Sequence, residues 1–241
     1  MKLDLNCDLG EGEPPRRTRA LMRWITSANV ACGGHAGDSA SMARCVRLCK
    51  ESDVCLGAHP GAWNRADFGR GETRIEPGDL ELLLLHQISA LNGIAQEQGV
   101  PLHHIKLHGA LYHAAEADER LARLYIDTLA RFWPKARIFA RAGGRVARLA
   151  RQAGLVAWEE AFADRGYRDD GTLVSRTESG AIVTDVKAIV RRVKDLASGR
   201  GLLSVSGRKL MLRPQTLCLH SDTPSALVIA RAVRNTLHGR K

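Results

Sequence analysis

The sequence predicts an α/β fold, an irregular (β/α) barrel of about seven parallel strands. Short apolar segments alternate with longer amphipathic ones along the whole chain of 241 residues. Strands that alternate with helices in this way are joined by right-handed crossovers and lie parallel in one sheet. About seven strand–helix pairs in a chain of this length favour a barrel. Because no repeat or Pro/Ser-rich linker divides the sequence, we expect one domain over residues 1–241.

The expected strands are the short apolar segments, and the expected helices are the amphipathic segments between them. The strands are placed at residues 2–8, 27–32, 54–58, 104–107, 137–140, 155–158 and 216–220. The helices are placed at residues 40–51, 77–98, 116–132, 144–153, 183–197 and 225–237. The last helix follows Thr223-Pro224, a pair that favours a helix start. In parallel α/β folds the active site lies at the carboxyl ends of the strands, so the residues after each strand are the functional candidates.

The composition excludes several classes of protein. The 36 Lys and Arg residues exceed the 26 Asp and Glu residues, which gives a formal net charge of +10. These basic residues are spread along the chain, and no recognition-helix or RNP-like motif is present, so we do not expect a nucleic-acid partner. No segment approaches the roughly 18 consecutive apolar residues of a membrane span, and the N-terminus lacks a signal-peptide core. We therefore expect a cytoplasmic protein without membrane contact.

Nearly every expected strand ends in ionisable or glycine-rich sequence. The side chains of interest in these segments are Asn6, Asp8, Glu11, His35, His59, Lys106, His108, Glu160, Arg165, His220 and Asp222. A single such residue is more often a helix cap or a loop residue, and Asp38 fits an N-cap in front of the helix at 40–51. The convergence of many ionisable groups at one end of a barrel is different, because their burial is costly. This pattern predicts a functional site.

Two of the three kinds of chemistry that fit this set involve a metal ion or a cysteine nucleophile. In metal-assisted hydrolysis, Asp8, His59 and His108 would bind a divalent ion that polarises water, although no HxxxH or HExxH spacing is present. In nucleophilic catalysis, Cys7 or Cys32 would attack the substrate. Each of these cysteines fits equally well as a small apolar residue inside a strand.

The third kind is acid/base and electrostatic catalysis without a metal. Asp8 or Asp222 would act as the base, and a histidine would carry protons. Lys106 would hold an anionic carboxylate or phosphate. The residues alone do not choose among these three kinds of chemistry.

Six segments, taken together, resemble the LamB/YcsF family, the A subunits of bacterial 5-oxoprolinase. In chain order they are DLNCDLGEG, ITSANVACGGHAGD, GAHPG, IKLHGALYH, EAFADRGY and HSDTP. Their order and spacing agree with the family from Leu3 to about Leu237. The neighbours of the ionisable residues differ: Gly34 stands where the family usually has Phe, Leu107 where it has Pro, and Ser221 where it has Gly. The resemblance implies an irregular barrel similar to that of the polysaccharide deacetylases.

The resemblance also implies an activity, namely ATP-dependent hydrolytic opening of 5-oxo-L-proline (pyroglutamate) to L-glutamate. Two partner subunits, B and C, would be required, and ATP with Mg²⁺ would be a substrate. A lactam is poorly electrophilic, so phosphorylation of its carbonyl oxygen would create a better leaving group before water attacks. Whether a transition metal is also bound stays open. The alternatives are a metal-dependent deacetylase or lactam hydrolase on the same barrel, and a non-catalytic anion-binding subunit.

The expected roles follow from this chemistry. Lys106 and Arg165 would bind carboxylate and phosphate, Asp8 or Asp222 would activate water, and His59 and His108 would handle protons. The remaining candidates would complete the substrate and phosphate contacts; they are Asn6, Glu11, His35, Glu160 and His220.

Overall fold

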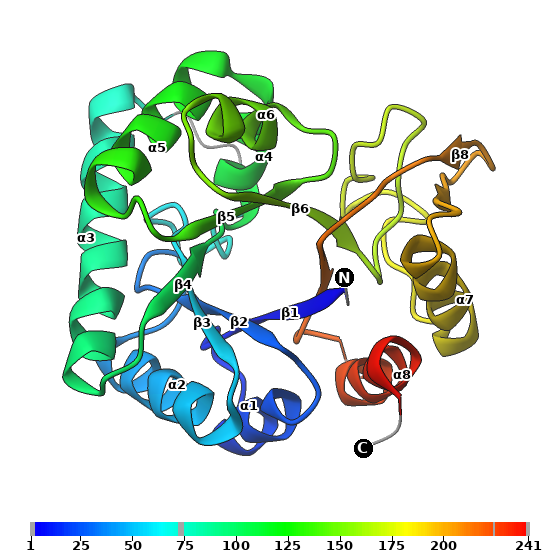
Figure 1. Ribbon diagram of the computed structural model, residues 1–241, viewed down its shortest axis with the longest axis horizontal. Helices are drawn as coiled ribbons and strands as arrows, with labels where there is room; N and C mark the ends of the chain where they lie inside the picture. Colours follow the sequence, from blue (N-terminus) through cyan, green and yellow to red (C-terminus); the bar gives the residue numbers. More distant parts are fainter. Residues whose placement is uncertain (1–2, 72–74, 224, 240–241) are drawn as a thin grey trace.

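A closed barrel of seven parallel strands forms the centre of the computed structural model, which describes residues 3–71, 75–223 and 225–239 (Figure 1). Its strands are β1 (Asp4–Leu9), β2 (Ser27–Ala31), β3 (Cys55–His59), β4 (Leu102–Ile105), β5 (Arg137–Arg141), β6 (Ala157–Phe162) and β9 (Thr216–Leu219). β9 pairs with both β6 and β1, which closes the barrel. The predicted irregular barrel of about seven parallel strands is confirmed. Lys2 and Pro224, which entered the predictions, lie outside the described residues.

Helices surround the barrel and cover its outer face (Figure 1). They are α1 (Pro15–Met22), α2 (Ser39–Ser52), α3 (Pro77–Glu97), α4 (Gly109–Ala117), α5 (Glu119–Phe132), α6 (Arg145–Gln152), α7 (Val186–Ala197) and α8 (Ala226–His238). The predicted cap is present, because the Asp38 carboxylate accepts a hydrogen bond of 2.7 Å from the Ser41 backbone N–H at the start of α2. Among the helices of the described residues, none combines the length and apolar character that crossing a membrane requires.

The structure differs from the expected elements in three places. α1 and most of α4 were not predicted, and the helix predicted at 116–132 corresponds to α5 together with the last two residues of α4, which meet at Asp118. The backbone of Asp118 is extended, and its carboxylate accepts a hydrogen bond of 2.7 Å from the Arg120 N–H, so it caps α5 and interrupts the helix. The connection from β6 to β9 contains a small antiparallel hairpin, β7 (Leu202–Leu203) with β8 (Lys209–Leu210), which the sequence did not indicate.

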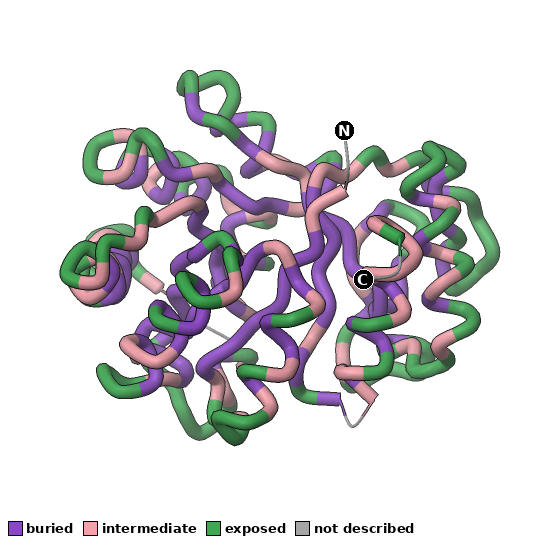
Figure 2. Tube along the Cα trace, turned by 60° about the horizontal axis from the view of Figure 1, so that its bottom comes forward, coloured by how far each residue is buried: buried purple, intermediate pink, exposed green. Residues whose placement is uncertain are grey.

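The pleat of β1 decides which of its side chains face the barrel interior. Leu5, Cys7 and Leu9 are fully buried in the hydrophobic core. Asn6 and Asp8 alternate with them and therefore point to the opposite side. Figure 2 shows that buried residues are concentrated in the central strands, whereas exposed residues lie on peripheral helices and loops. The barrel interior at this end is therefore lined by polar rather than apolar side chains.

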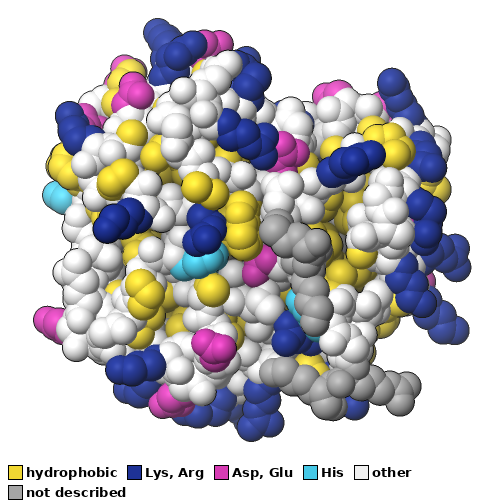
Figure 3. Space-filling view, viewed as in Figure 1, with side chains coloured by type: hydrophobic (Ala, Val, Ile, Leu, Met, Phe, Trp, Pro, Cys, Tyr) yellow, Lys and Arg dark blue, Asp and Glu magenta, His cyan; other side chains and the backbone are white. Residues whose placement is uncertain are grey.

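The positive charge is distributed over the surface. On the face that Figure 3 shows, Lys and Arg side chains lie over many elements, with acidic side chains between them. Several of the described ion pairs join such neighbours, for example Arg123 with Glu119 on α5 and Arg168 with Glu178.

Removing the cap at the α4–α5 boundary tests the account of the split helix. Asp118→Ala is expected to lower the free energy of unfolding by about 1 kcal/mol, because the first turn of α5 loses a hydrogen-bond acceptor. Asp127→Ala, at an exposed position of the same helix, is the matched control and should change stability by less than about 0.5 kcal/mol. Urea unfolding followed by circular dichroism measures both. Equal effects would show that Asp118 does not act as a cap.

Candidate active site

A cavity of about 550 Å³ opens at the carboxyl ends of the barrel strands. Asp8 near the end of β1, His59 at the end of β3 and Lys106 directly after β4 line its inner wall. His108 and His220, which follow β4 and β9, line it as well. Parallel strands bring these side chains to one end of the barrel although Asp8 and His220 lie near opposite ends of the sequence.

Lys106 is a buried cation held by carboxylates. Its Nζ lies 3.1 Å from Asp8 Oδ1, 3.0 Å from Glu160 Oε1 and 3.1 Å from Cys218 Sγ. Burial lowers the pKa of Lys106, but the attraction to Asp8 outweighs it, and the pKa lies well above its ordinary value. Burial raises the pKa of Asp8, and the charges of His59 and Lys106 reverse this and hold it well below its ordinary value. Both groups are therefore charged at neutral pH.

Amide side chains inside the barrel hold Asp8 and Glu160 in place. Asn29 Nδ2 donates to Asp8 Oδ1 and to Asn6 Oδ1, both at 2.7 Å. Asn6 Nδ2 donates to Glu160 Oε1 at 2.9 Å. His104 approaches from β4, with its Nε2 2.7 Å from Asn29 Oδ1. Burial holds the pKa of His104 well below its ordinary value, so the neutral ring donates this hydrogen bond.

His104 was not predicted as a site residue because it lies within a strand rather than after one. The signal that could have revealed it is Gly57 in β3. A Cβ atom at Gly57 would lie 2.0 Å from His104 Nε2, so only glycine leaves room for this imidazole inside the barrel.

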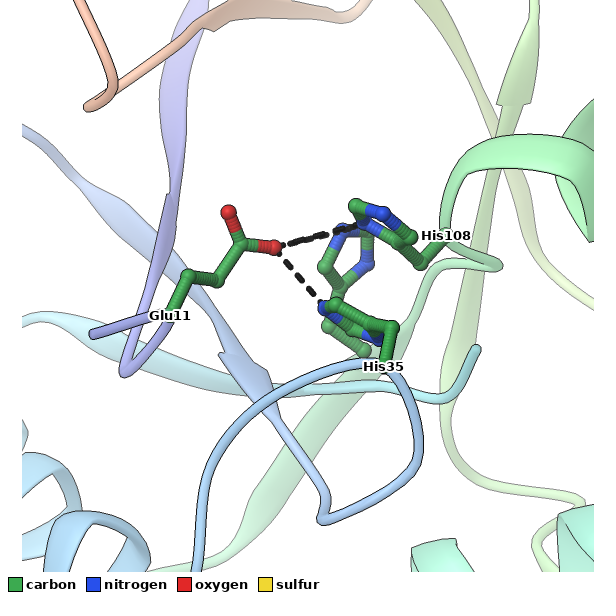
Figure 4. Close-up of side chains that lie close together, drawn as sticks. Glu11, His35 and His108 are labelled. Carbon is green, nitrogen blue, oxygen red and sulfur yellow. Dashed lines mark hydrogen bonds and ion pairs between the residues drawn. The ribbon is translucent and has the colours of Figure 1, made fainter. Parts of the chain in front are cut away.

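Glu11 and three histidines form a second group at the wall of the cavity, and Figure 4 shows the Glu11 carboxylate pointing toward His35 and His108. Glu11 Oε1 lies 2.9 Å from His35 Nε2, 3.3 Å from His108 Nδ1 and 3.8 Å from His59 Nε2. The rings of His35 and His108 are stacked, with centroids 3.6 Å apart. The four residues therefore form one contiguous cluster, although they come from the ends of β1, β2, β3 and β4.

The pKa values in this cluster move in different directions. Burial raises the pKa of Glu11, but hydrogen bonds with His108 and His35 outweigh it and hold it well below its ordinary value. Burial lowers the pKa of His35 to about 4 and also lowers that of His108. Burial also lowers the pKa of His59, but the charge of Asp8 outweighs this effect, and the pKa of His59 lies above its ordinary value. His59 is therefore the most basic of these three rings.

His220 is oriented by the carboxylate of Asp164, a strand-end residue that was not among the predicted site residues. Its Nδ1 lies 2.9 Å from Asp164 Oδ1, and its backbone N–H donates to Asp164 Oδ2 at 3.0 Å. Phe162 packs parallel to the ring, with centroids 5.8 Å apart. The imidazole is thus fixed from two sides while it lines the cavity. Asp164 follows β6 in the same motif as Arg165, so its position after a strand was the available signal.

Two of the predicted residues have structural contacts that differ from their expected roles. Asp222 does not join Asp8 at the inner wall; its Oδ2 lies between Arg70 Nη2 at 2.9 Å and Arg176 Nη1 at 3.1 Å. Arg165 lines the cavity, but it donates to the backbone carbonyls of Ala181 and Val174 at 3.1 and 2.7 Å, which fixes the loop after β6.

The two cysteines considered as nucleophiles are buried in the strand region. Burial raises the pKa of Cys32 to about 12 and raises that of Cys7 well above its ordinary value. A thiol attacks as the thiolate, which neither residue provides at neutral pH. Their burial supports the interpretation that Cys7 and Cys32 pack as small apolar residues in the strand region.

The substituted position Gly34 is explained by a neighbouring glutamine. A Cβ atom at Gly34 would lie 2.4 Å from both Gln87 Nε2 and the carbonyl oxygen of Gly61. Gln87 on α3 accepts a hydrogen bond of 3.0 Å from the Gly61 N–H and donates one of 2.7 Å to its carbonyl. The amide of Gln87 thus occupies the space beside Gly34 and fixes the turn that follows His59.

The charge balance around Lys106 can be tested through stability. Lys106→Met is expected to lower the free energy of unfolding by about 3–5 kcal/mol, because Asp8 and Glu160 stay buried without their cation. The double variant Lys106→Met/Glu160→Gln should recover part of this loss of stability. The control Lys135→Met, at an exposed position, should change the free energy of unfolding little. Urea unfolding measures all three. If Lys106→Met is as stable as the unchanged protein, the buried ion pairs do not hold this site together.

Comparison with known proteins agrees with the architecture and the motifs. The model of the LamB/YcsF family matches residues 3–241. The crystal structure of a lactam utilization protein from Thermus thermophilus is similar at 36% sequence identity and a TM-score of 0.89. The match covers 98% of this chain and 96% of that one.

Two more distant structures share the fold alone. A family 4 carbohydrate esterase from Streptomyces lividans has 13% identity and a TM-score of 0.50, covering 99% of this chain and 88% of that one. A putative cellobiose-phosphate cleavage protein from Enterococcus faecalis has 10% identity and a TM-score of 0.54, covering 98% and 90%. The predicted likeness to a deacetylase barrel is therefore confirmed. Because the family match extends over residues 3–241, this chain belongs to the LamB/YcsF family.

Proposed function

We propose that this chain is the A subunit of an ATP-dependent 5-oxoprolinase, which opens 5-oxo-L-proline to L-glutamate together with partner subunits B and C. The observation that carries the proposal is the charged Lys106–Asp8 pair at the inner wall of the cavity. Membership of the LamB/YcsF family supports a lactam as the substrate. The consumption of ATP would place the reaction in the cytoplasm.

The cavity provides cationic groups for a small anionic substrate. Arg70, Arg168 and Arg176 line it together with Lys106. The substrate carries one carboxylate, and ATP with Mg²⁺ would add a phosphoryl group at the lactam oxygen. Guanidinium groups suit both anions, because their donors match the paired oxygens of carboxylate and phosphate. We therefore assign these arginines to binding and Lys106 to stabilising the negative charge that develops on the reacting oxygen.

The inner wall provides the groups for water attack. Asp8 stays ionised, and its Oδ2 lies 3.5 Å from His59 Nε2. A water molecule between the substrate and Asp8 would therefore find a hydrogen-bond acceptor, the Asp8 carboxylate, next to the imidazole of His59. Asp8 orients this water and, as the base, accepts its proton. His220, which Asp164 holds, is placed to donate a proton to the ring nitrogen as the C–N bond breaks, which would leave an acyl phosphate of glutamate. A second water molecule would then hydrolyse this acyl phosphate to L-glutamate and inorganic phosphate.

The second candidate is a lactam hydrolase on the same barrel that needs no ATP. The cluster of Glu11 with three histidines favours it, because such a donor set suits a metal ion that polarises a carbonyl group. The two candidates differ in whether ring opening requires ATP.

Reconstitution tests the leading proposal. The protein is mixed with subunits B and C, 5-oxoproline, ATP and Mg²⁺, and glutamate and ADP are measured. We expect both products to form in equal amounts and only when every component is present. Absence of 5-oxoproline-dependent ADP release, with B and C shown to be competent with another A subunit, contradicts the proposal. Glutamate formation without ATP favours the second candidate.

A matched pair of variants distinguishes the two aspartates. Asp8→Asn is expected to lower kcat by about 10²–10⁴-fold, because water loses its charged acceptor. Asp222→Asn should leave kcat within about threefold, since this carboxylate contacts Arg70 and Arg176 rather than the inner wall. Steady-state kinetics of the reconstituted complex measures both. A large loss of kcat for Asp222→Asn alone would reassign the base.

A further inference from the structure

We propose that Glu11, His35, His59 and His108 form a binding site for a divalent transition-metal ion at the wall of the cavity. Each residue offers one ligand atom, and these atoms all lie within 4.8 Å of one another. His35, His59 and His108 are buried, and the Glu11 side chain is almost completely buried as well. Three imidazoles and one carboxylate suit Zn²⁺, Co²⁺ or Fe²⁺, whereas Mg²⁺ and Ca²⁺ prefer oxygen ligands.

The separations between the ligand atoms fit a common central ion. They are 2.9 Å from Glu11 Oε1 to His35 Nε2, 3.3 Å to His108 Nδ1 and 3.8 Å to His59 Nε2. His59 Nε2 and His108 Nδ1 lie 3.0 Å apart. Metal–ligand bonds of about 2.0–2.1 Å in tetrahedral geometry place neighbouring ligand atoms about 3.3 Å apart. Small side-chain rotations would therefore bring the cluster to metal-binding geometry, including a turn of one of the stacked His35 and His108 rings.

Hydrogen bonds outside the cluster fix which ring nitrogens carry hydrogen. His59 Nδ1 lies 2.8 Å from the carbonyl oxygen of Lys106, and His108 Nε2 lies 2.9 Å from that of Phe68. A carbonyl oxygen only accepts, so both of these nitrogens must donate. Imidazole rings that bind metals are commonly held in this way, by a carbonyl on the nitrogen that faces away from the ion.

The consequence is a conflict that a cation removes. With their outer nitrogens protonated, His59 and His108 would, as neutral rings, present lone pairs at Nε2 and Nδ1, which face each other at 3.0 Å. In the absence of a metal ion, one of these two atoms therefore carries a proton. Two lone pairs at this distance repel unless a proton or a metal ion lies between them. Glu11 Oε1 faces the same region, so the geometry gathers three electron-pair donors around one point.

The backbone of Phe68 indicates that this arrangement is costly to maintain. Phe68 has a φ of 60°, in the left-handed region that residues with a side chain rarely adopt. Its carbonyl group is the acceptor that orients His108. Strained backbone that persists beside a polar cluster is typical of functional sites.

The charge of the surroundings favours a divalent ion. The carboxyl side chains of Asp8, Glu11, Glu160 and Asp164 are buried at this end of the barrel, whereas the buried Lys and Arg side chains among the described residues are those of Lys106 and Arg165. Buried carboxylates require nearby positive charge, and a divalent ion would supply it. The ligand set differs from the one expected from sequence: Asp8 already bonds Lys106 and Asn29, and Glu11 takes its place beside His59 and His108.

Metal content tests the site without reference to turnover. The full-length protein, free of any affinity tag, is stripped with a chelator, exposed to Zn²⁺ or Co²⁺ and freed of excess ion. We expect about one metal ion per chain by mass spectrometry, and a visible Co²⁺ absorption spectrum typical of four- or five-coordination. Bound metal should also raise Tm, because it binds the folded state only.

Substitutions then identify the ligands. Glu11→Gln is expected to weaken metal binding by at least about 10-fold and to abolish the rise in Tm, with circular dichroism showing an unchanged fold. His35→Gln should weaken binding less than His108→Gln, because the Nδ1 atom of His35 is buried without a hydrogen-bond partner among the described residues and the ring is less firmly held. Asp8→Asn, on the other side of His59, and the exposed Glu97→Gln are the controls and should retain the metal.

Two results would overturn the proposal. One is less than about 0.1 metal ion per chain after exposure to excess Zn²⁺ and Co²⁺, which would leave a shared proton as the bridge between His59 and His108. The other is equal metal binding by Glu11→Gln and the unchanged protein, or its loss in Asp8→Asn instead. Neither result affects the reconstitution assay for 5-oxoproline, so failure of the metal site and failure of the proposed reaction are distinguishable.

Discussion

The buried ammonium of Lys106, held between the carboxylates of Asp8 and Glu160, is the interaction on which the polar end of the barrel depends. Removing one charge would leave the others desolvated and unpaired, which costs far more than the net gain from forming the pair. The three side chains come from β4, β1 and β6, so their mutual attraction also fixes these strands relative to one another. Asn6 donates a hydrogen bond to Glu160 Oε1 and Asn29 donates one to Asp8 Oδ1, the same oxygens that face Lys106, which holds both carboxylates in place.

Two regions with different chemistry adjoin this rigid group of charges. On one side the cavity presents Arg70, Arg168 and Arg176, which suit an anionic substrate. On the other side Glu11 gathers His35, His59 and His108 in a compact group. His59 belongs to both regions, because it lines the cavity and also contacts His108 and Asp8. Substrate binding and the histidine cluster are therefore in direct physical contact.

The loops after the strands are held by contacts that differ from those inside the barrel. Asp222 connects Arg70 and Arg176, and thus joins the loops that follow β3, β6 and β9 at the mouth of the cavity. Gln87 fixes the turn after His59 through both backbone groups of Gly61. The carbonyl of Phe68 reaches His108 from the same loop as Arg70. The shape of the cavity depends on these loop contacts as much as on the strands.

The sequence by itself determined the barrel, the end of it that carries the site, and the family. Strand and helix periodicities are local properties, and the parallel arrangement follows from their alternation. Asp8, His59, Lys106 and His108 could be selected because each stands at or directly after a strand. The split at Asp118 and the β7–β8 hairpin escaped because a single cap and two-residue strands give weak local signals.

Only the tertiary structure decided which of the selected side chains meet. It placed Asp222 between two arginines, brought Glu11 to the histidines, and added His104 and Asp164 to the site. These pairings depend on the pleat of each strand, on the paths of loops and on contacts between residues far apart in the chain. Such long-range geometry has no counterpart in linear spacing. The sequence therefore located the site, and the fold assigned each side chain its neighbours.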